Sequence, residues 1–245
     1  MRLFGLIGYP LSHSFSKTYF SEKFERERIT GCTYENFAIR SIEEFPELWR
    51  QHPELEGLNI TIPYKEQVVP FLTGRSDVVR SIGACNCISR DESGLSGYNT
   101  DVPGFERSLR KKLQPAHRRA LILGTGGASK AVQYTLVKLN IPFLVVSRSN
   151  TGTALTYAEL TPEVVFEHPL IINTTPIGMY PEVNDLPPLP YEAIGKGHFL
   201  FDLVYNPPLT KFLEMGVKQG AVIENGYEML VNQAEESWMI WNQLT

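Results

Sequence analysis

The stretch Leu121-Ile-Leu-Gly-Thr-Gly-Gly-Ala-Ser129 decides the fold of this chain. Apolar residues 120–123 predict a buried strand, and residues 128–139 predict a helix directly after the glycines. Glycines at this place allow a tight turn and a close approach of the backbone to a pyrophosphate, which the amides of the helix N-terminus then face. The stretch predicts a Rossmann-type dinucleotide site more strongly than a glycine-rich turn without a ligand, although Ser129 departs from the usual Gly or Ala. The expected cofactor-binding residues are Gly124, Gly126, Gly127 and Ala128.

The strand expected at residues 143–146 leads into Ser147-Arg148-Ser149. A carboxylate at this place would favour the ribose hydroxyls of NAD, whereas the Arg148 guanidinium can pair with a 2′-phosphate and stack on adenine. Ser147 and Ser149 add hydroxyl donors. The position favours NADP over a solvated arginine at a strand end, but no second arginine follows nearby. The strictness of NADP over NAD therefore stays open.

The whole chain predicts an α/β protein of two domains. Further strands at 170–172, 199–203 and 221–223 would continue a parallel sheet in a Rossmann-type NADP-binding domain at residues 104–224. Residues 1–103 alternate short strands and helices and form the expected substrate-binding catalytic domain. A long amphipathic helix at 226–244 is expected to return to that first domain, so residues 225–245 are assigned to it. Expected elements of the first domain are strands at 3–7, 33–39 and 57–62, helices at 16–28, 42–49 and 65–71, a hairpin at 84–98 and a connecting helix at 102–113.

The bulk composition is that of an ordinary soluble globular protein, with 245 residues, 42% hydrophobic and 20% charged, and a net charge of -4. The negative net charge does not suggest the basic surface with which proteins bind nucleic acid. The sequence also has no apolar run with the length of a membrane helix. Cys32, Cys85 and Cys87 make a poor disulfide framework, and no cysteine or histidine spacing suggests a metal site. We expect a cytoplasmic protein that acts on a small molecule without a metal, a nucleic acid or a membrane, as a monomer or a homodimer.

Two charged residues that precede the glycine-rich loop in the sequence are candidates for catalysis. Lys65 ends the proline-containing segment Asn59-Ile-Thr-Ile-Pro-Tyr-Lys65, and Asp101 ends the polar turn Gly97-Tyr-Asn-Thr-Asp101. An ammonium, a carboxylate and neutral hydrogen-bonding groups beside a dinucleotide indicate a small polar substrate held for hydride transfer. In isolation, a surface lysine and a turn aspartate would be the more common explanation of these two residues.

Eight blocks, in order and nearly end to end, make the chain resemble the shikimate dehydrogenase family. The resemblance implies NADP-dependent interconversion of 3-dehydroshikimate and shikimate in aromatic amino acid (chorismate) biosynthesis. It is more specific than any single motif. The blocks are Gly8-Tyr-Pro-Leu-Ser-His-Ser14-Phe-Ser16, Asn59-Ile-Thr61-Ile-Pro-Tyr-Lys65, Gly83-Ala-Cys-Asn86, Asn99-Thr-Asp101-Val-Pro-Gly104, the loop at 124–129, Ile172-Asn-Thr-Thr-Pro-Ile-Gly-Met179, Asp202-Leu-Val-Tyr-Asn-Pro-Pro208 and Gly226-Tyr-Glu-Met-Leu-Val-Asn-Gln233.

The resemblance implies a role for each site residue. Lys65 would donate the proton to the alkoxide that hydride transfer creates, with Asp101 as its partner. Leu203 or Met179 would pack on the nicotinamide, and Gly226 would offer backbone to its amide, although core packing explains these residues equally well. The substrate carboxylate would be bound by Ser14, Ser16 and Tyr205. The ring hydroxyls would be bound by Thr61, Asn86, Asp101 and Gln233.

Some residues allow an alternative interpretation, and others depart from the pattern of the family. Ser14 and Ser16 could instead cap the helix that follows, and Gln233 could be an ordinary helix residue. Lys17 adds a charge where the family often has proline, and residues 150–167 form a short stretch without a clear helix, next to the expected adenosine site. The chain could also be a quinate/shikimate dehydrogenase that uses NAD, or a non-catalytic homologue that binds shikimate or NADP. A relation by fold alone to another two-domain NADP enzyme would not explain the paired serines.

Overall fold

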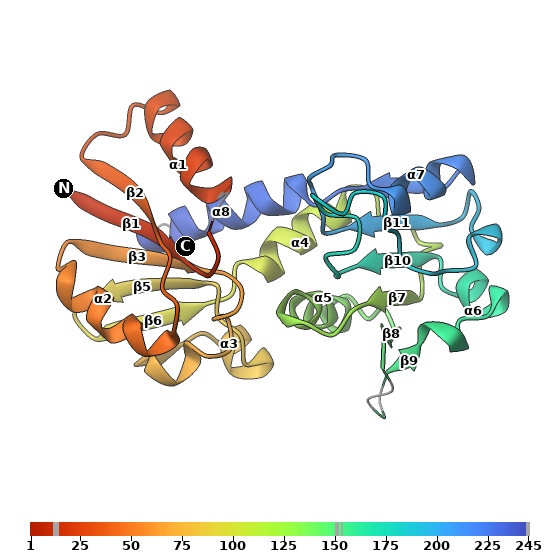
Figure 1. Cartoon of the computed structure of the whole chain (residues 1–245), viewed down its shortest axis with the longest axis horizontal. Helices are drawn as coiled ribbons and strands as arrows, with labels where there is room; N and C mark the ends of the chain where they lie inside the picture. The colour runs from red at the N-terminus through yellow and green to blue at the C-terminus, as the bar shows by residue number, and fades with distance from the viewer. Residues whose placement is uncertain (12–14, 150–151, 153, 244–245) are drawn as a thin grey trace. The chain divides into compact units, whose positions relative to one another are not determined.

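The computed structural model describes residues 1–11, 15–149, 152 and 154–243. The chain divides into two compact units (Figure 1). Unit 1 consists of Met1–Thr100 together with Ala234–Thr245, and unit 2 of Asp101–Gln233. Each unit is built on its own sheet, so the predicted α/β class is confirmed.

Unit 1 contains a mixed sheet with the strand order β2-β1-β3-β5-β6-β4. Strand β1 is parallel to β2 and β3, whereas β3, β5 and β6 run antiparallel to one another in turn. The hairpin expected at 84–98 is β5–β6. The strands are β1 (Arg2–Ile7), β2 (Cys32–Phe37), β3 (Leu55–Ile60), β4 (Gly74–Arg75), β5 (Cys87–Asp91) and β6 (Gly94–Tyr98). The helices that precede the second unit are α1 (Phe15–Arg26), α2 (Phe45–Gln51) and α3 (Asp77–Ile82).

Alternation along β1 produces two cores in unit 1, because successive side chains of a strand point to opposite faces. Leu3 and Ile7 pack with residues of α2 and α3 on one face. Phe4 and Leu6 pack on the other face with aromatic residues of α1 and of α8 (Tyr227–Trp241). The Trp241 indole lies so close to β3 that a Cβ on Gly57 would be 2.3 Å from its Nε1, which explains a glycine inside this strand.

The prediction of a helix at residues 65–71 is wrong. This segment forms turns and a short 3₁₀ helix at Val69–Phe71. Pro63 precedes the segment and Pro70 lies inside it. Pro70 lacks the N–H that an α-helix would need, and its ring would clash with the carbonyl of the preceding turn. Lys65 therefore lies in a turn and not on a helix.

Unit 2 contains an all-parallel sheet with the order β12-β11-β10-β7-β8-β9. Read from β9, this is the 3-2-1-4-5-6 order of a Rossmann fold, whose ligand crevice lies where the order reverses, between β7 and β10. The strands are β7 (Ala120–Leu123), β8 (Phe143–Ser147), β9 (Leu155–Thr156), β10 (Leu170–Asn173), β11 (Phe199–Asp202) and β12 (Val222–Glu224). The helices are α4 (Asp101–Arg110), α5 (Gly127–Lys138), α6 (Pro162–Glu167), α7 (Lys211–Lys218) and the first part of α8.

Helices cover both faces of this sheet, which keeps β7 and β10 fully buried. Residues of α4, α5 and α8 pack on one face, and residues of α6 and α7 pack on the other. The sequence predicted no clear helix in residues 150–167. This prediction is wrong, because α6 occupies part of that stretch. Thr161 caps α6 by accepting from the Val164 amide, and Pro162 fits its first turn.

Candidate active site

The glycine-rich loop joins β7 to α5 and has the backbone that the sequence predicts. Gly124 has φ +110°, and a Cβ there would lie 2.8 Å from Thr174 Oγ1, so only glycine fits. Gly126 is the N-cap of α5 in an extended conformation and has no atom within 4 Å of an added Cβ. The loop therefore leaves room for a group that approaches the N-terminal amides of α5, as a pyrophosphate would.

Ser129, which departs from the usual fingerprint, has a structural task in this loop. Its side chain is buried, and its hydroxyl donates to the Gly124 carbonyl at 2.8 Å while accepting from Gln133 Nε2 at 3.1 Å. The hydroxyl thus ties the first turn of α5 to the glycine loop. The departure at this position is therefore compatible with the loop geometry.

Ser147, Arg148 and Ser149 lie at the carboxyl end of β8, as expected. Ser147 is buried, and its hydroxyl accepts from the Ser149 amide at 3.3 Å. Arg148 is exposed, and its positive charge acts on the Tyr157 phenol, opposing the rise that burial causes in the pKa of that phenol. An exposed guanidinium at this strand end can reach a phosphate in solvent.

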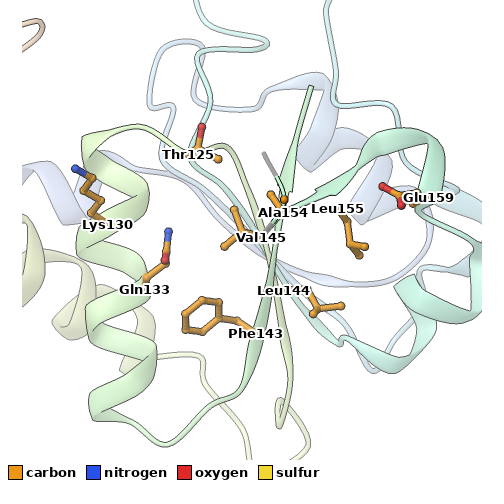
Figure 2. A pocket seen from close by; sticks show the side chains of 10 residues that line it. Thr125, Lys130, Gln133, Phe143, Leu144, Val145, Ala154, Leu155 and Glu159 are labelled. Carbon is orange, nitrogen blue, oxygen red and sulfur yellow. The ribbon is translucent and has the colours of Figure 1, made fainter. Parts of the chain in front are cut away.

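A cavity of about 740 Å³ extends along β8 on the side of α5. Figure 2 shows Gln133 on α5 and Phe143 and Val145 on β8 around it, with Thr125 of the glycine loop at one end. Among the described residues between β8 and β9 there is no helix to cover this face of the strand. The complete lining is Thr125, Lys130, Gln133, Phe143, Leu144, Val145, Gly152, Ala154, Leu155 and Glu159.

A buried carboxylate organises the loops that follow β10 and β11. Asp202 accepts from Asn173 Nδ2 at 2.9 Å, from the Val204 amide at 3.0 Å and from Thr210 Oγ1 at 2.6 Å. Asn173 in turn accepts from the amide and hydroxyl of Thr175. Burial raises the pKa of Asp202 from 3.8 to about 6, against the opposing effect of these hydrogen bonds. One carboxylate thus fixes both loops and the start of α7.

Leu203 and Gly226, both expected near the nicotinamide, lie in contact with each other. A Cβ on Gly226 would be 2.0 Å from the Leu203 carbonyl oxygen, and the Gly226 amide donates to the Val204 carbonyl at 3.1 Å. Only glycine permits this approach of two backbone segments. Met179, the alternative to Leu203, is exposed.

The variant Gly226→Ala is expected to destabilise unit 2 by about 2 kcal/mol, because the added methyl forces the backbone of Leu203 to move. Thermal unfolding followed by circular dichroism would measure the loss. Gly195→Ala is the matched control, since an added Cβ there meets no atom within 4 Å. Equal melting temperatures for the two variants would contradict the close packing described here.

In unit 1, the predicted substrate residues Thr61 and Asn86 and the predicted catalytic Lys65 lie at one edge of the sheet. Thr61 follows β3, and its amide donates to the Ile7 carbonyl at the end of β1. Asn86 precedes β5, and its carbonyl accepts from the Ile60 amide. The Lys65 carbonyl accepts from the Cys85 amide at 2.8 Å, which holds the lysine next to the Asn86 segment. Ser16 is the second residue of α1 and is 9% exposed.

The Asn86 side chain is oriented by Thr100. Its Oδ1 accepts from the Thr100 amide at 2.6 Å, and its Nδ2 donates to Thr100 Oγ1 at 3.0 Å. Because a backbone N–H can only donate, the amide orientation is determined. The second hydrogen of Nδ2 is then the donor that Asn86 can offer to a ligand.

The other predicted substrate residues belong to unit 2 or lie outside the described residues. Ser14 lies outside the described residues. Asp101 opens α4, is buried and belongs to unit 2, as do Tyr205 and Gln233. Gln233 is buried in α8 and donates to the Leu230 carbonyl at 3.0 Å, so it is no ordinary exposed helix residue. The Lys17 ammonium is paired with Glu35 at 2.7 Å.

Two classes of feature are missing from the part of the chain that the structure describes. None of its helices combines the length and the apolar character needed to cross a membrane. No three His, Cys, Asp or Glu side chains there are grouped so as to hold a metal ion.

Comparison with known proteins agrees with this geometry. The family model of the shikimate dehydrogenase substrate binding domain matches residues 6–88. Shikimate dehydrogenase (NADP(+)) of Caldanaerobacter subterraneus subsp. tengcongensis is 34% identical, over 98% of this chain and 91% of that protein. The corresponding protein of Caldicellulosiruptor saccharolyticus is 35% identical, over 98% and 92%. The chain belongs to the shikimate dehydrogenase family.

Solved structures of the shikimate dehydrogenase family share the fold over the whole chain. The Thermus thermophilus enzyme, in complex with NADP(H) and shikimate, has a TM-score of 0.88 at 28% identity and covers 99% of this chain and 94% of its own. A chorismate mutase/shikimate 5-dehydrogenase fusion protein from Clostridium acetobutylicum has a TM-score of 0.88 at 34% identity, with 99% and 92% covered. The two-domain Rossmann-type fold predicted from the sequence is confirmed.

In this shikimate dehydrogenase family member, sequence reasoning missed three residues that lie next to the predicted substrate residues. Tyr34, Thr100 and Ser237 are buried polar residues that contact the predicted substrate residues or their neighbours. No sequence signal could have found Tyr34 or Ser237, because each looks like an ordinary strand or helix residue. Thr100 lies inside the family block at residues 99–104, directly before Asp101.

Proposed function

We propose that this chain catalyses the reversible reduction of 3-dehydroshikimate to shikimate by NADPH, a cytoplasmic step in aromatic amino acid (chorismate) biosynthesis. Residues 1–103 and 225–245 are the proposed substrate domain, and residues 104–224 are the proposed NADP-binding domain. The observation that carries the proposal is the gathering of Thr61, Lys65 and Asn86 at one edge of the unit 1 sheet. Family membership and three free cysteines, as in a reducing compartment, support it.

Lys65 is the proposed proton donor in the reduction. When hydride reaches the ketone carbon, the carbonyl oxygen becomes an alkoxide that must take up a proton. An ammonium within hydrogen-bond reach stabilises that charge and supplies the proton, leaving a neutral amine that water reprotonates. Asp101 is the proposed partner of Lys65 in this step. In the reverse direction the neutral amine accepts the proton of the alcohol.

The remaining polar residues fit the substrate, a ring with one carboxylate and several oxygens. Ser14, Ser16 and Tyr205 are assigned to the carboxylate, which neutral donors can bind through charge-assisted hydrogen bonds. The ring oxygens are assigned to Thr61, Asn86, Asp101 and Gln233. For Asn86, the orientation fixed by Thr100 supports a donor role.

Unit 2 fits NADP in the shape of its glycine loop, where an added Cβ at Gly126 would meet no atom within 4 Å. The bound cofactor supplies the hydride. Arg148, with Ser147 and Ser149, is assigned to the 2′-phosphate, and Leu203 with Gly226 to the nicotinamide side. The backbone of the loop is assigned to the pyrophosphate, through Gly124, Gly126, Gly127 and Ala128.

The direct test is the loss of NADPH absorbance when the purified chain is mixed with 3-dehydroshikimate. Parallel assays with quinate and with NAD separate the proposed activity from that of a quinate/shikimate dehydrogenase. Turnover with 3-dehydroshikimate and NADPH that exceeds the other combinations is expected. Binding of shikimate or NADPH without any turnover would instead identify a non-catalytic homologue.

The variant Arg148→Ala is expected to raise the Michaelis constant for NADPH by about tenfold, and that for NADH by less than twofold. The reason is that a phosphate–guanidinium pair contributes about 1.5–3 kcal/mol. Steady-state kinetics with both cofactors would measure the difference. Arg119→Ala is the control, because Arg119 forms an exposed ion pair with Glu167 in the same unit. An equal change for the two cofactors would remove Arg148 as the phosphate-binding residue.

A further inference from the structure

The side chain of Asn86 is held at two points by a single residue, Thr100. Its Oδ1 accepts from the Thr100 amide at 2.6 Å, and its Nδ2 donates to Thr100 Oγ1 at 3.0 Å. One hydrogen bond would let the amide group swing about the remaining contact, whereas two bonds fix both its plane and its position. Asn86 is 2% exposed and Thr100 is 1% exposed, so water does not compete for these bonds.

The Thr100 hydroxyl is held in turn by α8. Ser237 Oγ of α8 lies 3.4 Å from Thr100 Oγ1, where either hydroxyl can donate, and it accepts from Asn59 Nδ2 at 2.8 Å. The same Asn59 nitrogen donates to the Asn86 carbonyl at 3.3 Å. Asn59, Asn86, Thr100 and Ser237 therefore form a closed ring of buried hydrogen bonds, which we call the Thr100 network. All four residues belong to unit 1.

The network selects one orientation of the Thr100 side chain. A threonine has few staggered χ1 positions, because two heavy atoms branch at its Cβ. With partners for Oγ1 on both Asn86 and Ser237, the orientation that directs the hydroxyl toward them is favoured over those that direct the methyl group there. The amide plane of Asn86 is thus determined by a residue of the chain next to Asp101 and by a serine of the last helix.

We propose that Thr100 is a positioning residue of the substrate site, whose hydroxyl, held by Ser237, orients the second hydrogen of Asn86 Nδ2 toward a ring oxygen of the substrate. The inference rests on the proposed function, which assigns Asn86 to a ring oxygen. Thr100 itself is not assigned to the substrate. A donor that is fixed before the substrate binds avoids the entropic cost of ordering it during binding.

The experiment compares Thr100→Val with Thr100→Ser in the full-length protein. Valine has the shape of threonine but no hydroxyl, and it keeps the backbone amide that Asn86 Oδ1 needs. Thr100→Val is expected to raise the dissociation constant of shikimate, measured by calorimetry, by about three- to tenfold, the range for one lost neutral hydrogen bond. Thr100→Ser retains the hydroxyl and should restore most of that affinity. The kcat of Thr100→Val should stay within about twofold of the unmodified protein, because the lost contact acts on bound substrate and transition state alike.

A double-variant cycle tests whether the effect passes through Asn86. Asn86→Ala removes the side chain that Thr100 positions, so its own dissociation constant for shikimate should rise. Adding Thr100→Val to Asn86→Ala is then expected to weaken binding no further, because two residues that act through one contact are not additive.

Two further variants separate this effect from a general loss of structure. Thr73→Val makes the same substitution elsewhere in unit 1, at a hydroxyl bonded to the Leu95 backbone, and should leave shikimate affinity unchanged. Ser237→Ala keeps both bonds between Thr100 and Asn86 but removes the support from α8. It is expected to weaken shikimate binding by about threefold, and it tests the network even if Thr100→Val does not fold.

Four outcomes would overturn the inference. The first is a shikimate affinity in Thr100→Val, or in Ser237→Ala if only that variant folds, that equals the affinity of Thr73→Val. The second is a Thr100→Ser variant as impaired as Thr100→Val, and the third is a double variant in which the two single effects multiply. The fourth is a Thr100→Val variant with a lower kcat and unchanged affinity, which would place the role of the hydroxyl at the neighbouring Asp101.

Failure of the inference is distinguishable from failure of the proposed function. The four outcomes above leave turnover of 3-dehydroshikimate by the unmodified protein intact. An unchanged affinity in Asn86→Ala would overturn the inference and remove Asn86 from the substrate ligands, but not the other assigned residues. Only a lack of turnover in the unmodified protein would overturn the proposed function itself.

Discussion

Lys65→Ala is expected to lower the kcat for 3-dehydroshikimate reduction by about 10²- to 10⁴-fold, the usual contribution of a positioned general acid. Lys65 is held in a turn between Pro63 and Pro70 and is tied by its carbonyl to Cys85, so truncating its side chain should not disturb the backbone. Shikimate affinity should stay nearly unchanged, because the carboxylate and ring hydroxyls keep their other ligands. Stopped-flow absorbance of NADPH and calorimetric binding of shikimate would measure the two quantities.

The control for this experiment is another lysine truncation. Lys138→Ala removes a surface ion pair with Glu106 in unit 2 and should keep full turnover. Lys65→Met retains the length of the side chain without its charge, and is expected to be as slow as Lys65→Ala. Near-normal turnover in either Lys65 variant would eliminate the proposed proton donor.

Asp202→Asn is expected to change how the stability of unit 2 depends on pH. The pKa of Asp202 is about 6 in the folded state against 3.8 for a free carboxyl, so the folded state holds this proton longer than the unfolded state. The resulting stability is fully present below about pH 4 and is lost as pH rises through 6. Two pKa units correspond to about 3 kcal/mol at most. The variant has no such proton and should lack this decline.

Urea unfolding between pH 4 and pH 7 would measure this dependence. Circular dichroism is the appropriate signal, because Trp49, Trp238 and Trp241 all lie in unit 1 and their fluorescence would not report on unit 2. Asp185→Asn, at an exposed carboxyl of unit 2, should retain the decline of the unmodified protein. The same decline in Asp202→Asn would show that another group is responsible.

Local sequence patterns predicted unit 2 more accurately than the turns of unit 1. The strands β7, β8, β10 and β11 lie within one residue of their expected bounds, because each is a short apolar run next to glycine or polar residues. The segment 65–71 was misassigned because its prolines outweigh its helical pattern. The helix α6 was overlooked because it is six residues long and is recognised mainly by its cap.

Side-chain pairing could not be predicted in the same way. The Tyr34–Asn59 bond joins residues 25 apart, and the Asn59–Ser237 bond joins residues 178 apart. Such partners are determined by the register and packing of whole elements, which single-sequence patterns do not contain. Family blocks predicted the ligands of the substrate, whereas a buried partner such as Thr100, which orients the Asn86 side chain, became visible only in the folded chain.

The division of helix α8 between the units has a consequence for biosynthesis. Trp241 donates to the Ile88 carbonyl across 153 positions, and Ala234, Trp238 and Trp241 complete one of the two cores of unit 1. A ribosome makes all of unit 2 before these residues emerge. During synthesis, the first hundred residues therefore expose an aromatic surface to which chaperones can bind. Unit 2 can already fold at that stage.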